Sequence, residues 1–376
     1  MWLECMKDIT NMRLVSQTYS LPQLILAACL VLLTSALVIG AISNLPIEGT
    51  PLGWDWQLIW TPIQNGQVDY ANGSMRVTPW GLPMLLPLGF LSFRLSWSIV
   101  TFITLIAYLL SVPRTGRRWE WALCAILLFT AYPAMRHIAD GNIEGFIMIG
   151  VLLIAFGYNR RQALPLSIGL LIATAKPQTV WLLAVWLGIY LVWQWQPRHW
   201  LRVGVIVLAV VLPTMLIYGA AWWAMMQVGH QVGTPVDVSL LASLGRQGQP
   251  IWLFGALGAL IVGVSSLLAL RTPHGLSAGK LGMLISASML VSPYTSSISL
   301  ITAFAFAVIG LLPSRPRLAA CLLILTDSLY LLPHDLARAY SAYLITCLLT
   351  LMWALCCWHL LNAKATPVAT SQASAA

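Results

Sequence analysis

Charged side chains are scarce in this sequence. Only 8% of its 376 residues are Asp, Glu, Lys or Arg, while 59% are hydrophobic. Roughly a quarter of the residues in a globular domain are charged, so this chain cannot cover itself with a water-soluble surface. Apolar runs of nearly membrane-spanning length recur from one end to the other. The composition therefore predicts an all-α polytopic membrane protein.

The chain also lacks a nucleic-acid footprint and a cysteine-based site. Its net charge is +9, but the basic residues lie in short connections and form no single patch, so no nucleic-acid partner is expected. Its seven cysteines mostly lie in apolar runs without metal-ligand spacing, which favours packing roles. His137 has no second histidine near it in sequence. We predict neither a metal nor a cofactor.

Twelve apolar runs are predicted to cross the membrane as helices. The first is too long for the core of a cleaved signal peptide, so we expect it to stay. The run 81–93 contains Pro83 and Pro87 and precedes Arg94, which favours a helix at the membrane interface. The predicted spans are 21–42, 96–112, 120–134, 143–158, 163–175, 178–194, 203–219, 251–270, 281–290, 297–312, 318–332 and 341–361. Residues 1–362 are expected to form one integral membrane domain, and 363–376 a disordered tail rich in Ala, Ser and Thr.

The placement of charge predicts which membrane face does chemistry. With a cytoplasmic N-terminus, fourteen of the twenty basic residues fall in cytoplasmic connections, in accord with the positive-inside rule. They are Lys7, Arg13, Arg114, Arg117, Arg118, Arg160, Arg161, Arg198, Arg202, Arg271, Lys280, Arg315, Arg317 and Lys364. The other cations and most carboxylates gather at the opposite face, where they can pair or bind a ligand. We expect a multi-pass cell-membrane protein with an extracytoplasmic working surface.

A long polar connection, part of residues 43–94, holds the first candidate residue. Most other connections are short, so its length indicates a functional loop. Asp55 lies between Trp54 and Trp56 in a chain with only eleven acidic residues. It is either a general base or an exposed loop carboxylate. The tryptophans either stack on a ligand or are ordinary interfacial anchors.

Lys176 is the second candidate. It lies between two apolar spans, where Pro177 interrupts the helix. An ionised lysine at membrane depth costs about 2.5–3.5 kcal/mol on insertion scales, so it marks a site or has a partner. Lys176 either extends to the outer surface or holds an anionic ligand.

A polar turn between the third and fourth spans contains Arg136, Asp140, Asn142 and Glu144. The planar fork of arginine matches phosphate oxygens. The alternative is a solvated turn with an internal pair between Arg136 and Asp140. Glu144 lies in the first turn of the next helix, where the helix dipole explains a carboxylate almost equally well. The loop 222–250 contains Arg246 and several glycines, which favour a mobile lid.

Several of these segments resemble glycosyltransferase family 87, the polyprenol-phosphate-mannose-dependent mannosyltransferases. The similar segments, within about 50–300, are Asp55 in an early outer loop, Pro79-Trp80-Gly81-Leu82-Pro83, Gly141-Asn142, Arg160-Arg161, Ala175-Lys176-Pro177-Gln178 and Ser292-Pro293-Tyr294. Asp55 and the Lys-Pro-Gln block are the specific ones. Asn142 stands where the family usually has glutamine.

The resemblance implies a GT-C-type glycosyltransferase fold with about twelve transmembrane helices. It implies transfer of a hexose, here mannose, from a polyprenyl-phosphate sugar donor to a hydroxyl of a lipid or glycan acceptor, with inversion. Asp55 would be the base, Lys176, Arg136 and Arg246 would hold the donor phosphate, and the substrate would contact Trp54, Trp56, Asp140, Asn142, Glu144 and Gln178.

Two other classes of protein remain open. A lipid-linked-sugar transporter or flippase would also bury charges among about twelve spans. A non-catalytic lipid-binding membrane protein would keep the basic residues without needing Asp55. Substitution of Asp55 separates both from an enzyme.

Overall fold

In the computed structural model the chain is described over residues 21–45, 52–66, 68, 70, 77–115, 117–228, 237–272, 275–331 and 334–362. Across these ranges the regular structure is helical, with one isolated bridge between Asp237 and Ser296. The predicted disordered tail, 363–376, lies outside the described residues, as do Glu48, Asp69 and Arg76 of the long polar connection within 43–94.

Long α-helices alternate with short helical turns along the chain. In order, the helices are α2 (Leu21–Ser43), α3 (Trp54–Gln64), η1 (Pro79–Gly81), α4 (Leu82–Gly89), α5 (Phe93–Ser111), α6 (Arg118–Thr130), α7 (Tyr132–Asp140), α8 (Glu144–Asn159), α9 (Ala163–Ala173), α10 (Pro177–Gln194), α11 (Pro197–Val228), α12 (Leu240–Arg246), α13 (Ile251–Arg271), α14 (Ala278–Val291), η2 (Ser297–Ser299), α15 (Leu300–Phe304), η3 (Ala305–Ile309), α16 (Pro316–Asp327), η4 (Ser328–Leu331) and α17 (His334–Leu361).

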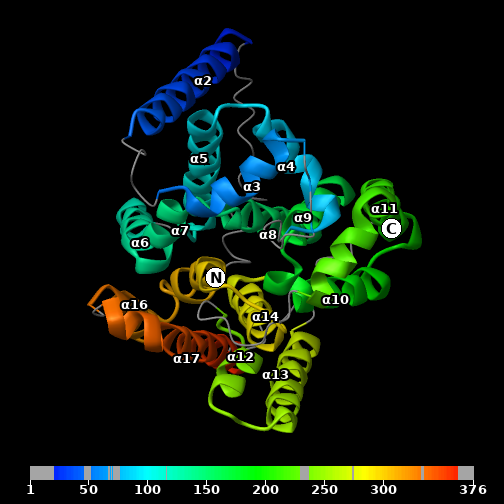
Figure 1. Cartoon of the computed structure of the whole chain (residues 1–376), viewed down its shortest axis with the longest axis vertical. Coiled ribbons are helices and arrows are strands. Elements are labelled where there is room, and N and C mark those ends of the chain that lie inside the picture. Colours follow the sequence, from blue (N-terminus) through cyan, green and yellow to red (C-terminus); the bar gives the residue numbers. More distant parts are fainter. Residues whose placement is uncertain are drawn as a thin grey trace, which may run out of the picture.

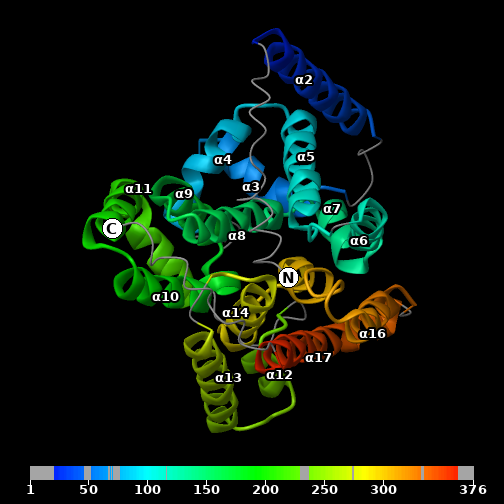
Figure 2. The same ribbon diagram turned by 180° about the vertical axis from the view of Figure 1, so that it is seen from behind.

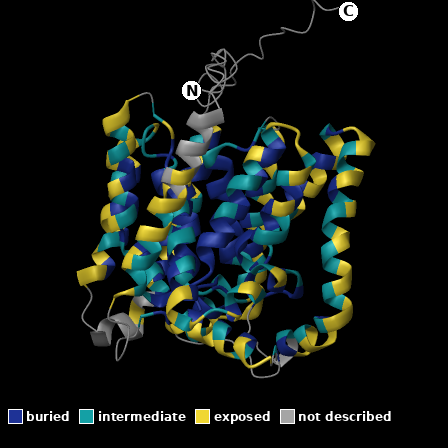
Figure 3. Cartoon of the chain, turned by 90° about the horizontal axis from the view of Figure 1, so that it is seen from above, coloured by how far each residue is buried: buried dark blue, intermediate teal, exposed yellow. Residues whose placement is uncertain are grey.

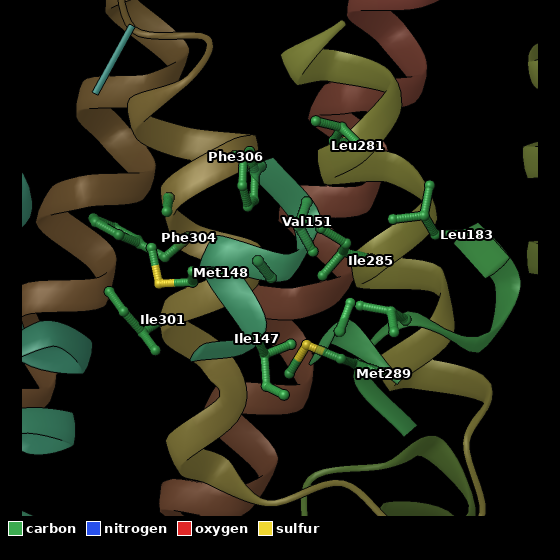
Figure 4. Packing of buried hydrophobic residues seen from close by; sticks show 14 of the residues in the cluster. Ile147, Met148, Val151, Leu183, Leu281, Ile285, Met289, Ile301, Phe304 and Phe306 are labelled. Carbon is green, nitrogen blue, oxygen red and sulfur yellow. The ribbon is translucent and has the colours of Figure 1, made fainter. Parts of the chain in front are cut away.

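The core lies between two central helices, α8 and α14 (Figure 1). α8 packs against α5 and α9, and α14 packs against α10, α13 and α17. Apolar side chains such as Met148 and Val151 of α8 and Ile285 and Met289 of α14 fill the space between them (Figure 4). Buried residues concentrate in the middle of the molecule, and exposed residues lie on the outer helices (Figure 3). Many of the exposed residues are large and apolar, such as Leu216 and Trp252.

Four of the described helices are long and apolar enough to cross a membrane: Phe93–Ser111, Pro197–Met226, Ile251–Arg271 and Ala342–Leu361. A fifth candidate is the pair α6 and α7, which are bent by 55° relative to each other. All twelve predicted spans coincide with helices, but several are short. At about 1.5 Å per residue, the 16 residues of α8 extend only about 24 Å, less than the roughly 30 Å of a bilayer core.

Local breaks explain why these helices are shorter than the apolar runs. Pro133 lies in the first turn of α7, where a helix tolerates proline but a continuous helix from α6 would not. The run predicted as one span at 297–312 is divided among 3₁₀, α and π turns. Average hydropathy does not detect such breaks.

The described part of the connection between α2 and α5 is largely helical. The segment expected at the interface forms η1 and α4, and the unpredicted helix α3 precedes them. Trp56, Ile59 and Ile63 are buried at helical spacing and hold α3 against the bundle. Gly53 precedes α3 with φ 73°, a left-handed conformation that suits glycine. Asp55 is thereby fixed in the first turn of a helix.

Candidate functional site

Segments that are far apart in sequence meet where α8 and α10 begin. The backbone N–H of Gly53, just before α3, donates to the Ala139 carbonyl at 2.7 Å. The N–H of Thr78 donates to the Ala175 carbonyl at 3.0 Å. α3, α7 and the start of α8 accordingly lie together (Figure 2). The Pro-Trp-Gly and Lys-Pro-Gln blocks, separate in sequence, are thus adjacent in the structure.

Gly141 permits the closest of these approaches. Its φ is 70°, and a Cβ atom there would lie 2.9 Å from Gly53 Cα and 2.8 Å from Trp97 Nε1. Only a residue without a side chain fits both the backbone conformation and the space. The turn that carries Asn142 therefore touches the turn that carries Asp55.

Asn142 joins the two main candidates. Its Nδ2 donates to Asp55 Oδ2 at 2.6 Å, and its Oδ1 accepts from Lys176 Nζ at 2.5 Å. The orientation of the amide follows from chemistry, because a carboxylate accepts and an ammonium group only donates. One side chain thus holds a carboxylate and a cation at its two ends. Asn142 therefore positions these two side chains. The sequence had predicted only a contact between Asn142 and substrate.

Lys176 is also paired with Glu144. Its Nζ lies 3.1 Å from Glu144 Oε1, and the two side chains are only 8% and 0% exposed. Glu144 further accepts hydrogen bonds from Ser299 and, at 2.7 Å, from Thr302. A buried ion pair is tolerated only when its remaining lone pairs are satisfied, and these hydroxyls satisfy them. Glu144 therefore positions Lys176, and it is fully enclosed by protein.

A buried histidine holds the backbone of Asn142. His137 Nε2 lies 2.9 Å from the Asn142 carbonyl, and His137 Nδ1 lies 2.8 Å from the Tyr108 hydroxyl. Because a carbonyl only accepts, Nε2 carries a hydrogen, and the Tyr108 hydroxyl, which also donates to the Ala134 carbonyl at 3.2 Å, contacts the other ring nitrogen. Asn142 is therefore fixed through both its side chain and its main chain.

The pair between Arg136 and Asp140, which the sequence left open, is present. Arg136 Nε lies 2.6 Å from Asp140 Oδ2, one helical turn apart on α7. The Arg136 side chain is 59% exposed, so its guanidinium group stays accessible beside the turn. Asp140 is largely committed to this pair.

The two tryptophans beside Asp55 have different environments. Trp54 is 60% exposed at the start of α3. Trp56 is fully buried, and its indole N–H donates to Ser96 Oγ at 2.6 Å. Its predicted contact with substrate does not agree with this position, because no face of the ring is open. Trp56 instead anchors α3 on α5.

Two predicted residues, Gln178 and Arg246, are not joined to Asn142 by the hydrogen bonds described above. Gln178 is half-buried in the first turn of α10, two residues after Lys176. Arg246 lies on α12, where it donates to Ser243 Oγ and its guanidinium stacks over the Tyr343 ring at 5.0 Å. These contacts hold Arg246 against α17 and do not join it to Asn142.

Sequence reasoning missed the hydroxyl groups that satisfy Glu144. Ser299 and Thr302 are three residues apart, a spacing that places them on one face of a helix in an otherwise apolar run. That pattern signals a buried polar partner, but it does not identify Glu144, more than 150 residues earlier in the chain. Tyr108, within an apolar span, gave no stronger signal.

Comparison with known proteins identifies the family. The model of glycosyltransferase family 87 matches residues 78–293, more than half of the chain. The match includes Asn142, Glu144 and Lys176, and it begins after Asp55. No curated protein and no solved structure matches the chain. The chain belongs to glycosyltransferase family 87, and it is a membrane glycosyltransferase that uses a sugar donor and an acceptor.

Proposed function

We propose that this chain transfers a hexose, mannose in the first instance, from a polyprenyl-phosphate sugar to an acceptor hydroxyl at the extracytoplasmic face of the cell membrane. In this proposal the fold is of the GT-C type, with about twelve helices placed in the membrane. The observation that carries the proposal is the hydrogen-bonded line from Asp55 through Asn142 to Lys176. It holds a base and a cation in one fixed arrangement.

Asp55 would act as the general base. Its side chain is half-buried, and Asn142 occupies one of its two oxygens. A carboxylate has about four lone-pair sites, so it can accept a further hydrogen bond from the acceptor hydroxyl. The hydroxyl proton passes to Asp55 as the new bond to the anomeric carbon forms. The bond from that carbon to the phosphate oxygen breaks with its electron pair leaving on the phosphate, which inverts the anomeric centre.

Lys176 and Arg136 would stabilise the departing phosphate. Two of the three N–H groups of the Lys176 ammonium are used by Asn142 and Glu144, which leaves one donor for a phosphate oxygen. Arg136 presents an accessible guanidinium group on the adjacent helix turn. Fixed donors directed at developing negative charge lower the barrier without reorganising during the reaction.

The direction of the helices supports an extracytoplasmic site. α8 and α10 both begin beside the network, and their far ends are followed by Arg160, Arg161 and Arg198. Basic connections favour the cytoplasmic side, so the opposite ends of the same helices, with Asn142 and Lys176, would face outward.

The proposal is tested with purified protein in lipid vesicles. A set of polyprenyl-phosphate sugars labelled in the sugar is offered with hydroxyl-bearing membrane lipids and glycans as acceptors. We expect the label to leave the polyprenyl lipid and enter an acceptor with inverted configuration. Movement of intact donor across the bilayer without cleavage would instead support a transporter, and binding without either would support a lipid-binding protein.

A further inference from the structure

A second candidate site lies where α9 and α11 begin, at the ends of these two helices that are farthest from Asn142. A groove of about 790 Å³ lies between the starts of α9 and α11, which run side by side (Figures 1 and 2). At their other ends these two helices meet Trp80, which donates to Thr174 Oγ1 and contacts the Trp222 ring. The groove and the proposed sugar-transfer site are therefore at opposite faces of the same helices.

The groove is basic at its mouth. Arg198 and Arg202 line it one helical turn apart, and both are exposed. The sequence has no Asp or Glu between Glu144 and Asp237. In the part of the chain that the structure describes, neither arginine lies within ion-pair distance of a carboxylate. The charge complement of this groove is an anion.

Beyond the arginines the groove is apolar. Leu201 and Val205 line it, and the same face of α11 continues along the helix. The residues on this exposed stripe are Leu201, Val205, Leu208, Leu212 and Leu216. From Arg202 to Leu216 the helix rises about 21 Å, which reaches past the middle of a hydrocarbon core of roughly 30 Å. A ligand that fits both parts has an anionic head and a long apolar chain.

We propose that this groove binds one anionic glycerophospholipid of the surrounding leaflet. Its phosphate lies between Arg198 and Arg202, whose guanidinium groups form bidentate hydrogen bonds with phosphate oxygens. One acyl chain follows the apolar stripe of α11. Basic pockets between helices at the cytoplasmic side recognise lipid head groups in this way, and the positive-inside rule assigns the two arginines to that side. The site is independent of sugar transfer.

The test uses the purified full-length chain in detergent, with lipid retention measured by native mass spectrometry. Phosphatidylglycerol, phosphatidylcholine and a polyprenyl phosphate are offered in parallel. We expect wild-type protein to retain phosphatidylglycerol in preference to both other lipids. The paired substitution Arg198→Gln with Arg202→Gln should weaken that binding by about 30-fold, from the free energy of two basic residues near an anionic head group.

Two further variants separate the groove from general surface charge. Arg271→Gln with Arg317→Gln removes the same charge from exposed arginines outside the groove, and it should leave binding within about twofold of wild type. Val205→Trp fills the groove without changing its charge, and it should weaken phosphatidylglycerol binding by about tenfold or more. This variant tests the proposal even if the protein with Arg198→Gln and Arg202→Gln does not fold. Equal loss in both arginine pairs, unchanged binding by Val205→Trp, or a preference for polyprenyl phosphate would overturn the proposal.

Discussion

Replacing Glu144 with glutamine is expected to destabilise the protein strongly. Glu144 is fully buried, its carboxylate pairs with Lys176 at 3.1 Å, and Ser299 and Thr302 donate to it. Glutamine keeps the shape and can still accept hydrogen bonds, but it leaves the Lys176 ammonium buried without a counter-charge. Removing one partner of a buried ion pair costs about 3–5 kcal/mol. We expect a loss of that size in the free energy of unfolding.

A double-mutant cycle isolates the pair. Lys176→Met removes the charge from the other side, and the double variant with Glu144→Gln leaves no buried charge. We expect a coupling energy of about 2–3 kcal/mol between the two positions. The control is the pair of Arg117 and Glu120, which lie 3.7 Å apart and are 71% and 33% exposed. The same cycle there should give less than about 1 kcal/mol, because solvent screens an exposed pair.

The assay is reversible unfolding in mixed micelles, with helix content followed by circular dichroism as the denaturing detergent increases. Lipid composition and pH are the same for all variants. A loss below about 1 kcal/mol for Glu144→Gln, or additive effects of the two substitutions, would refute the conclusion that Lys176 is held by a buried ion pair.

Three further predictions concern the turn beside this pair and the buried side chain of Tyr70. Asn142→Leu removes both hydrogen bonds that join Asp55 and Lys176. If Asp55 is the base, its displacement should lower the rate of sugar transfer about 100-fold in single-turnover assays. A change below about threefold would contradict the positioning role of Asn142. Gly141→Ala should lower the free energy of unfolding by more than Gly248→Ala does. Both glycines have positive φ, but only at Gly141 would the added Cβ lie within 3 Å of Gly53 and Trp97. Equal losses in the two variants would contradict the close approach of Gly141 to Gly53. Burial raises the pKa of Tyr70 above its ordinary value of about 10. The unfolded chain then releases this proton before the folded chain does, so stability should fall as the pH rises above about 10, and Tyr70→Phe should reduce that slope.

The sequence singled out two charged groups that the structure brings together, because rare charges in an apolar chain are easy to recognise. Asp55 and Lys176 were singled out on that basis, and the structure joins them through Asn142. Periodicity could not distinguish Trp54 from Trp56 until helix α3 was known. Two residues apart on a helix differ by about 200° in direction, so one indole faces outward and the other is buried.

The sequence could not predict which side chains from distant segments contact each other, or how long each helix is. The contact of Glu144 with Ser299 and Thr302 is a tertiary one with no periodic signal. Each predicted apolar run overlaps at least one helix, but the run 120–134 is divided between α6 and α7, and breaks such as the one before Pro133 depend on how neighbouring helices pack.

The most direct test of the proposed chemistry is the rate of sugar transfer by Asp55→Asn. Asparagine keeps the shape and can still accept the hydrogen bond from Asn142, so the fold and donor binding should stay within about twofold of wild type. Loss of the base should lower the single-turnover rate with a polyprenyl-phosphate sugar by about 100- to 10,000-fold. A variant that binds donor normally and transfers sugar at the wild-type rate would contradict the assignment of Asp55 as the base.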